Sequence, residues 1–251
     1  MTAIAAARAL HLLDLTDLSD HCREAAVDDL CQRAITPHGP VAAICIWPRF
    51  VAQARKRLAA SPVKIATVIN FPDGGDNIER AINDAREALR DGTDEIDVVM
   101  PWRSFLAGDE VTAREMIAAL ADETGPERVL KVILETGALA TPEAIAAASR
   151  LAIAAGASFI KTSTGKFAIS ATPQAAEIML EEIRASARPV GFKAAGGVRT
   201  LAEANSYLAL ADRIMGPGWA TAATFRIGAS SLLDALLADI DGGGGVAQGG
   251  Y

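Results

Sequence analysis

The chain has 251 residues, of which 51% are hydrophobic, and it carries a formal net charge of −7. This composition fits a folded protein with a sizeable core, and the acidic balance gives no general attraction to nucleic acid or to anionic membranes. Because no uninterrupted apolar run reaches the roughly 18 residues that cross a bilayer, we expect neither nucleic acid nor a membrane as a partner.

In chain order, the sequence predicts a helical N-terminal extension, eight strands that alternate with helices, and a glycine-rich tail. Residues 1–38 precede the first expected strand and are predicted to form a helical cap over one end of the fold. The tail, 241–251, contains six glycines and is expected to be flexible. No linker interrupts the chain, so we expect one domain over residues 1–251. The expected strands are 41–47, 64–70, 95–100, 129–136, 159–164, 190–194, 212–215 and 225–228.

This alternation predicts an α/β fold in which parallel strands close into a (β/α)₈ barrel, the TIM barrel. Most strand starts lie roughly 22 to 34 residues apart, which is the length of one strand–helix unit. The interval between the strands at 212 and 225 is too short for a full helix, so the strand numbering is open to a shift of one. An open, doubly wound sheet is the alternative, and it is disfavoured because no G-x-G-x-x-G follows the first expected strand.

Two lysines stand out because each interrupts an apolar strand. Lys161 alone could extend from its strand end into solvent. Lys193, however, occupies the matching place in the next strand–helix unit, and neighbouring strands lie about 4.8 Å apart. Repulsion between two ammonium groups and burial of both are each expected to lower a lysine pKa. Since a neutral amine is the nucleophile that forms an imine, the pair favours Schiff-base catalysis.

A carboxylate inside another apolar strand adds to this cluster. Asp97 has an apolar residue on each side and is expected to point into the barrel. There it could pair with Lys193 and relay protons. Asp94 and Glu95 lie at the start of the same strand, where exposure to solvent is plausible.

Several polar residues are weaker candidates for supporting roles. Asp14 could join the interior cluster, or it could cap a helix or form part of a turn. Cys45 lies in the first expected strand and is interpreted as packing that faces the interior. Lys131 and Glu135 could form a supporting ion pair or belong to the structure of the barrel bottom.

Cysteine and histidine usage bears on compartment and on metals. The three cysteines are odd in number and form no C-x-x-C pair, which favours a reduced, cytoplasmic compartment over a disulfide framework. His11, His21 and His38 are scattered, so we expect neither a histidine-based metal site nor a catalytic triad. Cys22 and Cys31 are interpreted as buried helical residues rather than metal ligands.

Three glycine-containing loops that follow expected strands suggest a phosphate site. Glycines let backbone N–H groups approach an anion, and the N-terminus of a helix adds positive potential. The late loops of a TIM barrel commonly form such a site. The candidate residues are Thr164, Gly165, Lys166, Gly196, Gly197, Arg199, Gly228, Ser230 and Ser231.

These motifs resemble the deoxyribose-phosphate aldolase family, from about residue 10 to residue 231 with a possible extension to the C-terminus. The matching stretches are 13–16, 42–50, 70–72, 94–99, 159–166, 191–193, 196–200 and 225–231. The resemblance implies reversible cleavage of 2-deoxy-D-ribose 5-phosphate to acetaldehyde and D-glyceraldehyde 3-phosphate, with no metal or other cofactor.

The resemblance also assigns roles to individual residues. It implies the Schiff base at Lys161, a pKa-perturbing role for Lys193 and proton relay by Asp97, with the phosphate held by Lys166 and the glycine and serine loops. It further implies that Tyr251 reaches the site on its tail to assist proton transfer, whereas the composition of the tail by itself indicates disorder.

The chain departs from the family pattern at two positions. Ala194 stands where the family usually has Pro, and Trp47 stands where Tyr is common. Neither departure removes a reacting group. An isomerase and a non-catalytic sugar-phosphate-binding protein, each on a phosphate-binding barrel, are the alternative functions, although neither requires two interior lysines. We expect small sugar phosphates and aldehydes as partners and a homodimer as the assembly.

Overall fold

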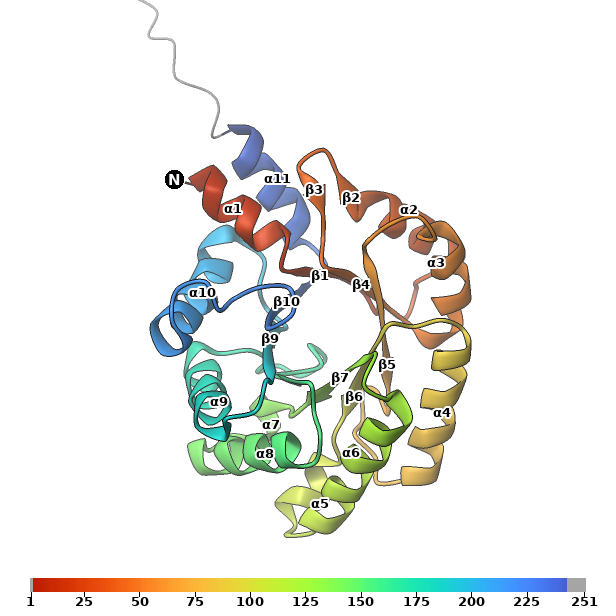
Figure 1. The fold of residues 1–251 in the computed structure, drawn as a ribbon, viewed down its shortest axis with the longest axis vertical. Coiled ribbons are helices and arrows are strands. Elements are labelled where there is room, and N and C mark those ends of the chain that lie inside the picture. The colour runs from red at the N-terminus through yellow and green to blue at the C-terminus, as the bar shows by residue number, and fades with distance from the viewer. Residues whose placement is uncertain (1, 243–251) are drawn as a thin grey trace, which may run out of the picture.

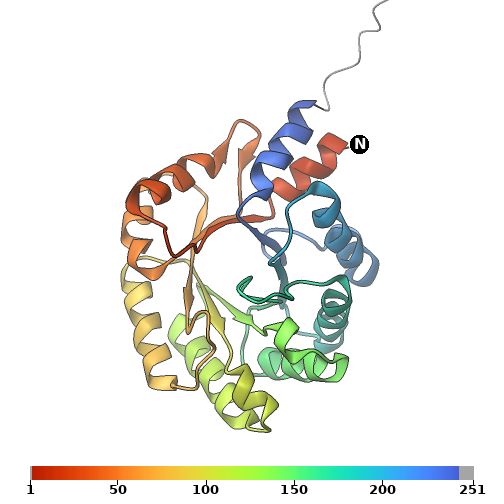
Figure 2. The same ribbon diagram turned by 180° about the vertical axis from the view of Figure 1, so that it is seen from behind.

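The computed structural model describes residues 2–242 and shows a closed barrel of eight parallel strands surrounded by helices (Figures 1 and 2). The first strand pairs with both the second and the last strand of the barrel, which closes the sheet and excludes the open doubly wound alternative. The barrel strands are β1 (Leu13–Asp17), β4 (Ala43–Ile46), β5 (Lys64–Ile69), β6 (Glu95–Val99), β7 (Val129–Ile133), β8 (Phe159–Lys161), β9 (Gly191–Ala195) and β10 (Phe225–Ala229).

Helices cover the outside of the barrel, and a short hairpin of β2 (Ile35–Thr36) and β3 (Gly39–Pro40) precedes β4. Two of the longer helices begin in the same way: Thr141 and Thr172 each accept a hydrogen bond from the backbone N–H three residues later, and proline follows each threonine. The helices are α1 (Thr2–Leu10), α2 (Glu24–Arg33), η1 (Pro48–Phe50), α3 (Val51–Arg57), α4 (Ile78–Arg90), α5 (Trp102–Leu106), α6 (Glu110–Thr124), α7 (Thr136–Leu139), α8 (Pro142–Ala154), α9 (Pro173–Ser186), α10 (Leu201–Met215) and α11 (Leu232–Gly242).

The apolar core lies mainly between the outer face of the sheet and the helices. In β6, for example, Ile96 and Val98 belong to the large apolar cluster shared with the helices. The alternate residues Glu95 and Asp97 are buried too, but they contact charged side chains from other strands inside the barrel. Successive side chains of a strand point to opposite faces of the sheet. Because the helices bury the apolar side chains on the outer face, the inner face is available for charged residues.

Two predicted elements are wrong. The residues 212–215, expected to be a strand, form the last turn of α10, which is anchored at its start by a capping box between Thr200 and Glu203. The missing strand is β1, which lies within the 1–38 segment that was expected to be helical. In β1, Asp14, which could have capped a helix or formed part of a turn, lies between two leucines. The other seven predicted strands are confirmed, although most are shorter than expected.

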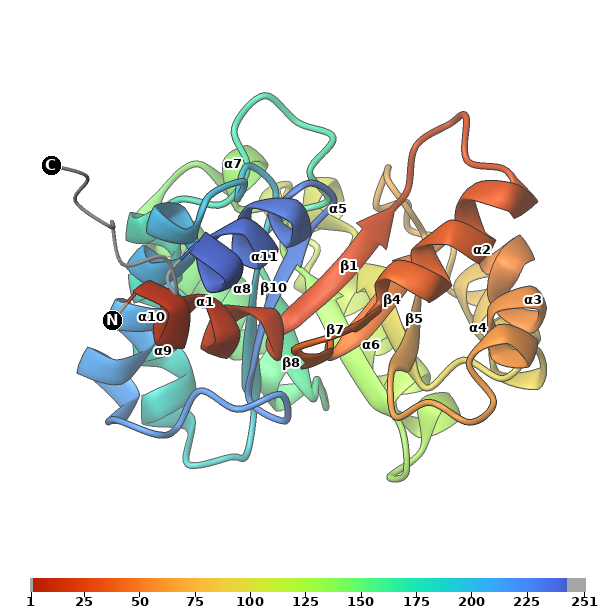
Figure 3. The ribbon, with the colours of Figure 1, turned by 90° about the horizontal axis from the view of Figure 1, so that it is seen from above.

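The two ends of the described chain lie side by side, with α1 packed against α11 in each view (Figures 1 to 3). The guanidinium of Arg8 donates two hydrogen bonds of 2.6 Å to the carboxylate of Asp212 and so ties α1 to α10. Helix α11 extends to Gly242, so the first two residues of the expected flexible tail are helical, and the rest of that tail lies outside the described residues. No helix within 2–242 combines the length and apolar character that a bilayer span requires.

We expect Gly191→Ala to destabilise the barrel. A Cβ at this position in β9 would lie 2.4 Å from the ring of Phe159, which pairs with Gly191 in the sheet. Overpacking of this kind typically costs about 1–3 kcal/mol. Urea unfolding should therefore show a lower free energy of unfolding for Gly191→Ala. Gly242→Ala is the matched control, since nothing lies within 4 Å of the added Cβ, and equal stability of the two variants would contradict this account.

Candidate active site

Seven charged side chains meet inside the barrel. They come from six strands, and each residue is at most 4% exposed. Burial of a charge is costly unless the charge is paired, so the arrangement of these groups decides what the interior can do. The seven residues are Asp14 on β1, Glu95 and Asp97 on β6, Lys131 on β7, Lys161 on β8, Lys193 on β9 and Arg226 on β10.

The strand register brings these groups to similar heights. Lys161 pairs with Lys193 across β8 and β9, as their matching positions predicted, and Lys193 pairs in turn with Arg226 on β10. On the next two strands of the barrel, Asp97 pairs with Lys131 across β6 and β7. Side chains that start level with one another can meet in the middle of a barrel filled by layers.

Asp97 accepts hydrogen bonds from three lysines. Its Oδ1 accepts from Lys131 Nζ at 2.8 Å, and its Oδ2 accepts from Lys161 Nζ and from Lys193 Nζ at 2.8 Å each. Burial alone would raise the pKa of this carboxyl, but the three ammonium groups hold it well below its usual value. Asp97 is therefore an ionised carboxylate in hydrogen-bond contact with both lysines of the pair.

Lys193 corrects one expectation from the sequence. Its Nζ donates to Asp14 Oδ2 at 2.5 Å and to Asp97 Oδ2 at 2.8 Å. Burial disfavours the charged form, but these two carboxylates outweigh it, and the pKa of Lys193 is raised rather than lowered. The two lysines are therefore not equivalent, and Lys193 is a stable ammonium group.

Lys161 has the opposite electrostatic balance. Its Nζ, among the described residues, hydrogen-bonds one carboxylate, that of Asp97. Burial lowers the pKa of Lys161; the Asp97 carboxylate opposes this, and the neighbouring ammonium of Lys193 lowers the pKa further. Lys161 is thus the interior lysine that most readily becomes a neutral amine.

The weaker candidates also lie in or beside the cluster. Asp14, buried in β1, accepts from Lys193 and also from Arg226 at 2.7 Å, so it is not a helix cap. Lys131 pairs with Glu95 at 2.5 Å as well as with Asp97, and it forms no ion pair with Glu135 within residues 2–242.

An apolar wall adjoins the lysines. Cys45 packs with Leu18, Ala66 and Val68, with Trp47 and Phe71 at the edge of the group. Burial raises the pKa of the Cys45 thiol. The wall therefore offers a neutral surface beside Lys161.

A cavity of about 310 Å³ opens above Lys161 at the carboxyl ends of the strands. All nine residues expected to bind phosphate line it, together with the end of β1 and the loop that follows. Gly196 shows why this lining needs glycine: its φ is +90°, and a Cβ there would lie 2.6 Å from the Cβ of Ser170. Lys166 reaches across the cavity, and its Nζ donates to the backbone oxygen of Leu18 at 2.9 Å. The site therefore joins a buried amine to a mouth rich in backbone N–H groups.

The sequence model that represents the DeoC/LacD family of aldolases matches residues 8–238 of this chain. The chain belongs to this family. It is therefore an aldolase of the class that works through a lysine Schiff base.

Individual relatives agree with this assignment. The deoxyribose-phosphate aldolase of Agrobacterium fabrum is 52% identical over 240 residues, which cover 95% of this chain and 93% of the relative. The crystal structure of an apo protein from Toxoplasma gondii, described as a candidate deoxyribose-phosphate aldolase, has a TM-score of 0.88 at 25% identity and covers 96% of this chain and 97% of its own. The tetrameric deoxyribose phosphate aldolase of Aeropyrum pernix shares the fold, with a TM-score of 0.76 at 24% identity and coverage of 95% of this chain and 92% of its own.

The two departures from the family pattern leave the interior of this aldolase intact. Ala194 lies in β9 opposite Ile227 and belongs to the apolar cluster outside the barrel, while Lys193 beside it keeps both of its carboxylate partners. The Trp47 indole donates to the backbone oxygen of Ser19 at 3.0 Å and packs edge-on against Phe71.

Sequence reasoning missed the buried positions of Glu95 and Arg226 in this aldolase. Glu95 was expected to be exposed, but it is 2% exposed and accepts hydrogen bonds from Lys131 and Arg226. Arg226 was not singled out, although a charge between Phe225 and Ile227 in an apolar strand is the same signal that identified Lys161. Both residues lie deeper in the barrel than the cavity mouth.

Glu135 was interpreted as an ion-pair partner of Lys131 or as part of the barrel bottom, and neither interpretation holds among the described residues, because Glu135 lies at the carboxyl end of β7. It has a left-handed backbone, with φ of 58°, directly after β7. Its Oε2 accepts from the backbone N–H of Thr164 at 3.2 Å and from Thr164 Oγ1 at 2.6 Å, and burial raises its pKa. A non-glycine residue in this conformation carries strain that the surrounding contacts must maintain. Glu135 thus fixes the loop that carries Lys166.

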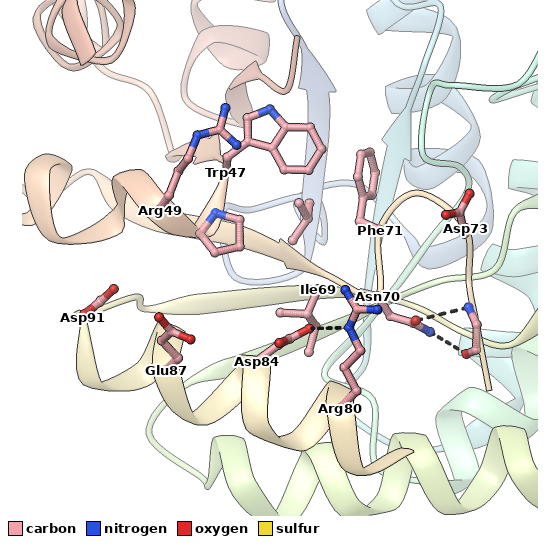
Figure 4. A pocket seen from close by; sticks show the side chains of 13 residues that line it. Trp47, Arg49, Ile69, Asn70, Phe71, Asp73, Arg80, Asp84, Glu87 and Asp91 are labelled. Atoms are coloured by element: carbon pink, nitrogen blue, oxygen red, sulfur yellow. Dashed lines mark hydrogen bonds and ion pairs between the residues drawn. The ribbon is translucent and has the colours of Figure 1, made fainter. Parts of the chain in front are cut away.

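A second cavity, of about 470 Å³, lies beside the barrel mouth between β4, β5 and α4 (Figure 4). Asn70 holds its rim by hydrogen bonds with the backbone of Gly75, and Arg80 lies near Asp84 on α4. None of the seven buried charged residues lines it. Across residues 2–242, no group of three or more His, Cys, Asp and Glu side chains is arranged to hold a metal ion.

Proposed function

We propose that this aldolase reversibly cleaves 2-deoxy-D-ribose 5-phosphate to acetaldehyde and D-glyceraldehyde 3-phosphate, with Lys161 as the imine-forming amine. One observation carries the proposal: Lys161 is the interior lysine, among the described residues, that also lines the cavity of the glycine and serine loops. The name of the Agrobacterium fabrum relative, with 52% identity, supports this choice of substrate.

The lowered pKa of Lys161 supports its role as the nucleophile. A lysine with the ordinary pKa of about 10.4 is neutral in only about one molecule in 2,500 at pH 7. Each unit by which the pKa falls increases the neutral fraction about tenfold until half of the molecules are neutral. Burial beside Lys193 therefore favours attack by Lys161 at neutral pH.

The reaction then follows from the contacts of the cluster. The neutral Nζ of Lys161 attacks C1 of the open-chain sugar, and loss of water from the carbinolamine gives an iminium ion. Removal of the C3 hydroxyl proton releases glyceraldehyde 3-phosphate as the C2–C3 bond breaks, and its electrons form an enamine. Protonation of the enamine at C2 and hydrolysis release acetaldehyde and regenerate Lys161. Asp97 and Lys193, which hydrogen-bond each other, are placed to relay these protons.

The cavity mouth is suited to the phosphate of the substrate. Helix α10 begins at Leu201, soon after Gly196 and Gly197, and α11 begins at Leu232, directly after Ser230 and Ser231. Backbone N–H groups at helix starts favour anions, and the lining residues Lys166 and Arg199 add positive charge. Binding energy from the phosphate would align the bond that breaks.

Reductive trapping tests the proposed function. Borohydride in the presence of acetaldehyde should add the mass of one ethyl group to Lys161, because it reduces the imine to a stable secondary amine. Lys161→Met should be neither labelled nor active. An unlabelled Lys161, together with activity retained in the variant, would rule out the proposal. An isomerase or a binding protein would give no such adduct.

Replacement of Lys166 tests the phosphate site. Lys166→Met should raise KM for the phosphorylated sugar about 10- to 100-fold, since a hydrogen bond to a charged group is worth about 1.5–3 kcal/mol. Cleavage of unphosphorylated 2-deoxyribose should hardly change. Lys56→Met, on an exposed position of α3, is the control. A similar loss with both sugars would argue against a phosphate contact.

We also propose that Tyr251 assists protonation at C2 of the enamine. The family resemblance supports this role, and Tyr251 itself lies outside the described residues. Deletion of Tyr251 should slow turnover while leaving trapping at Lys161 unchanged. Unchanged turnover would assign no catalytic role to the tail.

We propose a cytoplasmic homodimer as the working form. The three cysteines form no disulfide, which suits a reducing compartment. Twofold dimers are the commonest closed assemblies, although the Aeropyrum pernix protein is a tetramer. Sedimentation velocity measures the mass directly, and a species of 26.1 kDa would be a monomer.

A further inference from the structure

Six of the seven buried charged residues form a closed ring in which acidic and basic side chains alternate. We call it the charge ring. Each member contacts the next through an ion pair of 2.8 Å or less between the closest atoms. In order, the ring runs Asp14, Arg226, Glu95, Lys131, Asp97 and Lys193, and returns to Asp14.

The charge ring is neutral when all of its members are ionised, because three carboxylates face three cations. Lys161 is the fourth cation, and it is attached to the ring through Asp97. A protonated Lys161 would thus give the seven buried residues a net charge of +1, whereas a neutral Lys161 leaves these seven residues balanced. In a medium of low dielectric constant, an excess charge of this kind is costly.

We infer that Glu95 and Arg226 are positioning residues that keep Lys161 in its neutral form by balancing the charge of the ring. The inference rests on the proposed role of Lys161 as the imine-forming amine. Neither residue lines the cavity, and both lie on the side of the ring away from Lys161. Their effect on the reaction is therefore electrostatic and does not require contact with substrate.

The contacts of the two residues support this role. Arg226 Nη1 donates to Asp14 Oδ1 at 2.7 Å, and its Nη2 donates to Glu95 Oε1 at 2.7 Å. Its Nε donates to the backbone oxygen of Ala222 at 2.5 Å, and its guanidinium lies 5.8 Å from the centre of the Phe159 ring. The guanidinium is thereby fixed in the ring as a permanent positive charge.

Two further titratable groups, Cys45 and Glu135, interact with Lys161. Asp97 on β6 and Lys193 on β9 are members of the charge ring. Cys45 faces the lysines from β4, and burial raises the pKa of its thiol, so it is neutral at pH 7. Glu135 follows β7, interacts with Lys161 at longer range and accepts from Thr164. Because Glu135 is the same in every variant compared below, it does not contribute to the differences between them.

Two substitutions should move the titration of Lys161 in opposite directions. Arg226→Met leaves the ring at −1, which favours protonated Lys161 and raises its pKa. Glu95→Gln leaves the ring at +1, which disfavours protonated Lys161 and lowers its pKa. Glu95 and Arg226 do not hydrogen-bond Lys161 directly. We therefore expect each substitution to shift the pKa of Lys161 by about one unit, the low end of the range for nearby charges. The measurement is the rate of reductive trapping with acetaldehyde as a function of pH, on the full-length protein.

Control variants separate charge from structure. The double variant Glu95→Gln with Arg226→Met restores neutrality. The midpoint of its trapping rate against pH should return to that of the unaltered protein. Arg226→Lys keeps the charge but loses the hydrogen-bond geometry, and its midpoint should stay in place. If Arg226→Met does not fold, the shift in Glu95→Gln and its absence in Arg226→Lys decide the matter.

Shifts of the same sign in the two single variants, or no shift in Glu95→Gln, would overturn the inference. A structural role alone would lower the rate or the stability without moving the two midpoints apart. Absence of trapping at Lys161 in the unaltered protein would instead refute the proposed function. The two failures are therefore distinguishable.

Discussion

The interior of this aldolase depends on Asp97, whose carboxylate accepts hydrogen bonds from three lysines. A single carboxylate, buried at the centre of the barrel, holds Lys131, Lys161 and Lys193 at 2.8 Å each. Without it, Lys131 and Lys193 would each keep one carboxylate partner, Glu95 and Asp14, while Lys161 would lose the carboxylate to which it hydrogen-bonds. With it, one lysine stays charged between two carboxylates while another, with a single partner, is free to lose its proton.

The fold supplies the conditions for this interaction. The helices bury the outer face of the sheet, so the stability of the barrel comes largely from an apolar layer that the charges do not occupy. The parallel register then places Lys161 beside Lys193 and Lys131 beside Asp97. Loops at the carboxyl ends of the same strands line the cavity, so the strands that carry the buried lysines also carry the loops proposed to bind phosphate.

Sequence reasoning found the barrel, seven of its strands, and Lys161, Lys193 and Asp97, because a charge in an apolar strand is a strong signal. It missed β1, since Asp14 and Thr16 in a short stretch resemble a cap or a turn as much as a strand. It also misjudged Lys193, because the pKa of a buried lysine depends on which carboxylates meet it. Those partners come from strands far apart in sequence, and only the closed barrel shows that Asp14 and Asp97 both reach it.

The pairing of β1 with β10 has a consequence for how activity arises during folding. Asp14 and Arg226 are separated by 212 positions along the chain, yet they share a hydrogen bond inside the barrel. The charge ring therefore cannot form in a nascent or partly folded chain, in which Lys161 would behave like any solvated lysine. If Lys161 is the imine-forming amine, as we propose, imine formation therefore requires the closed barrel, and reductive trapping at this amine would report on native topology.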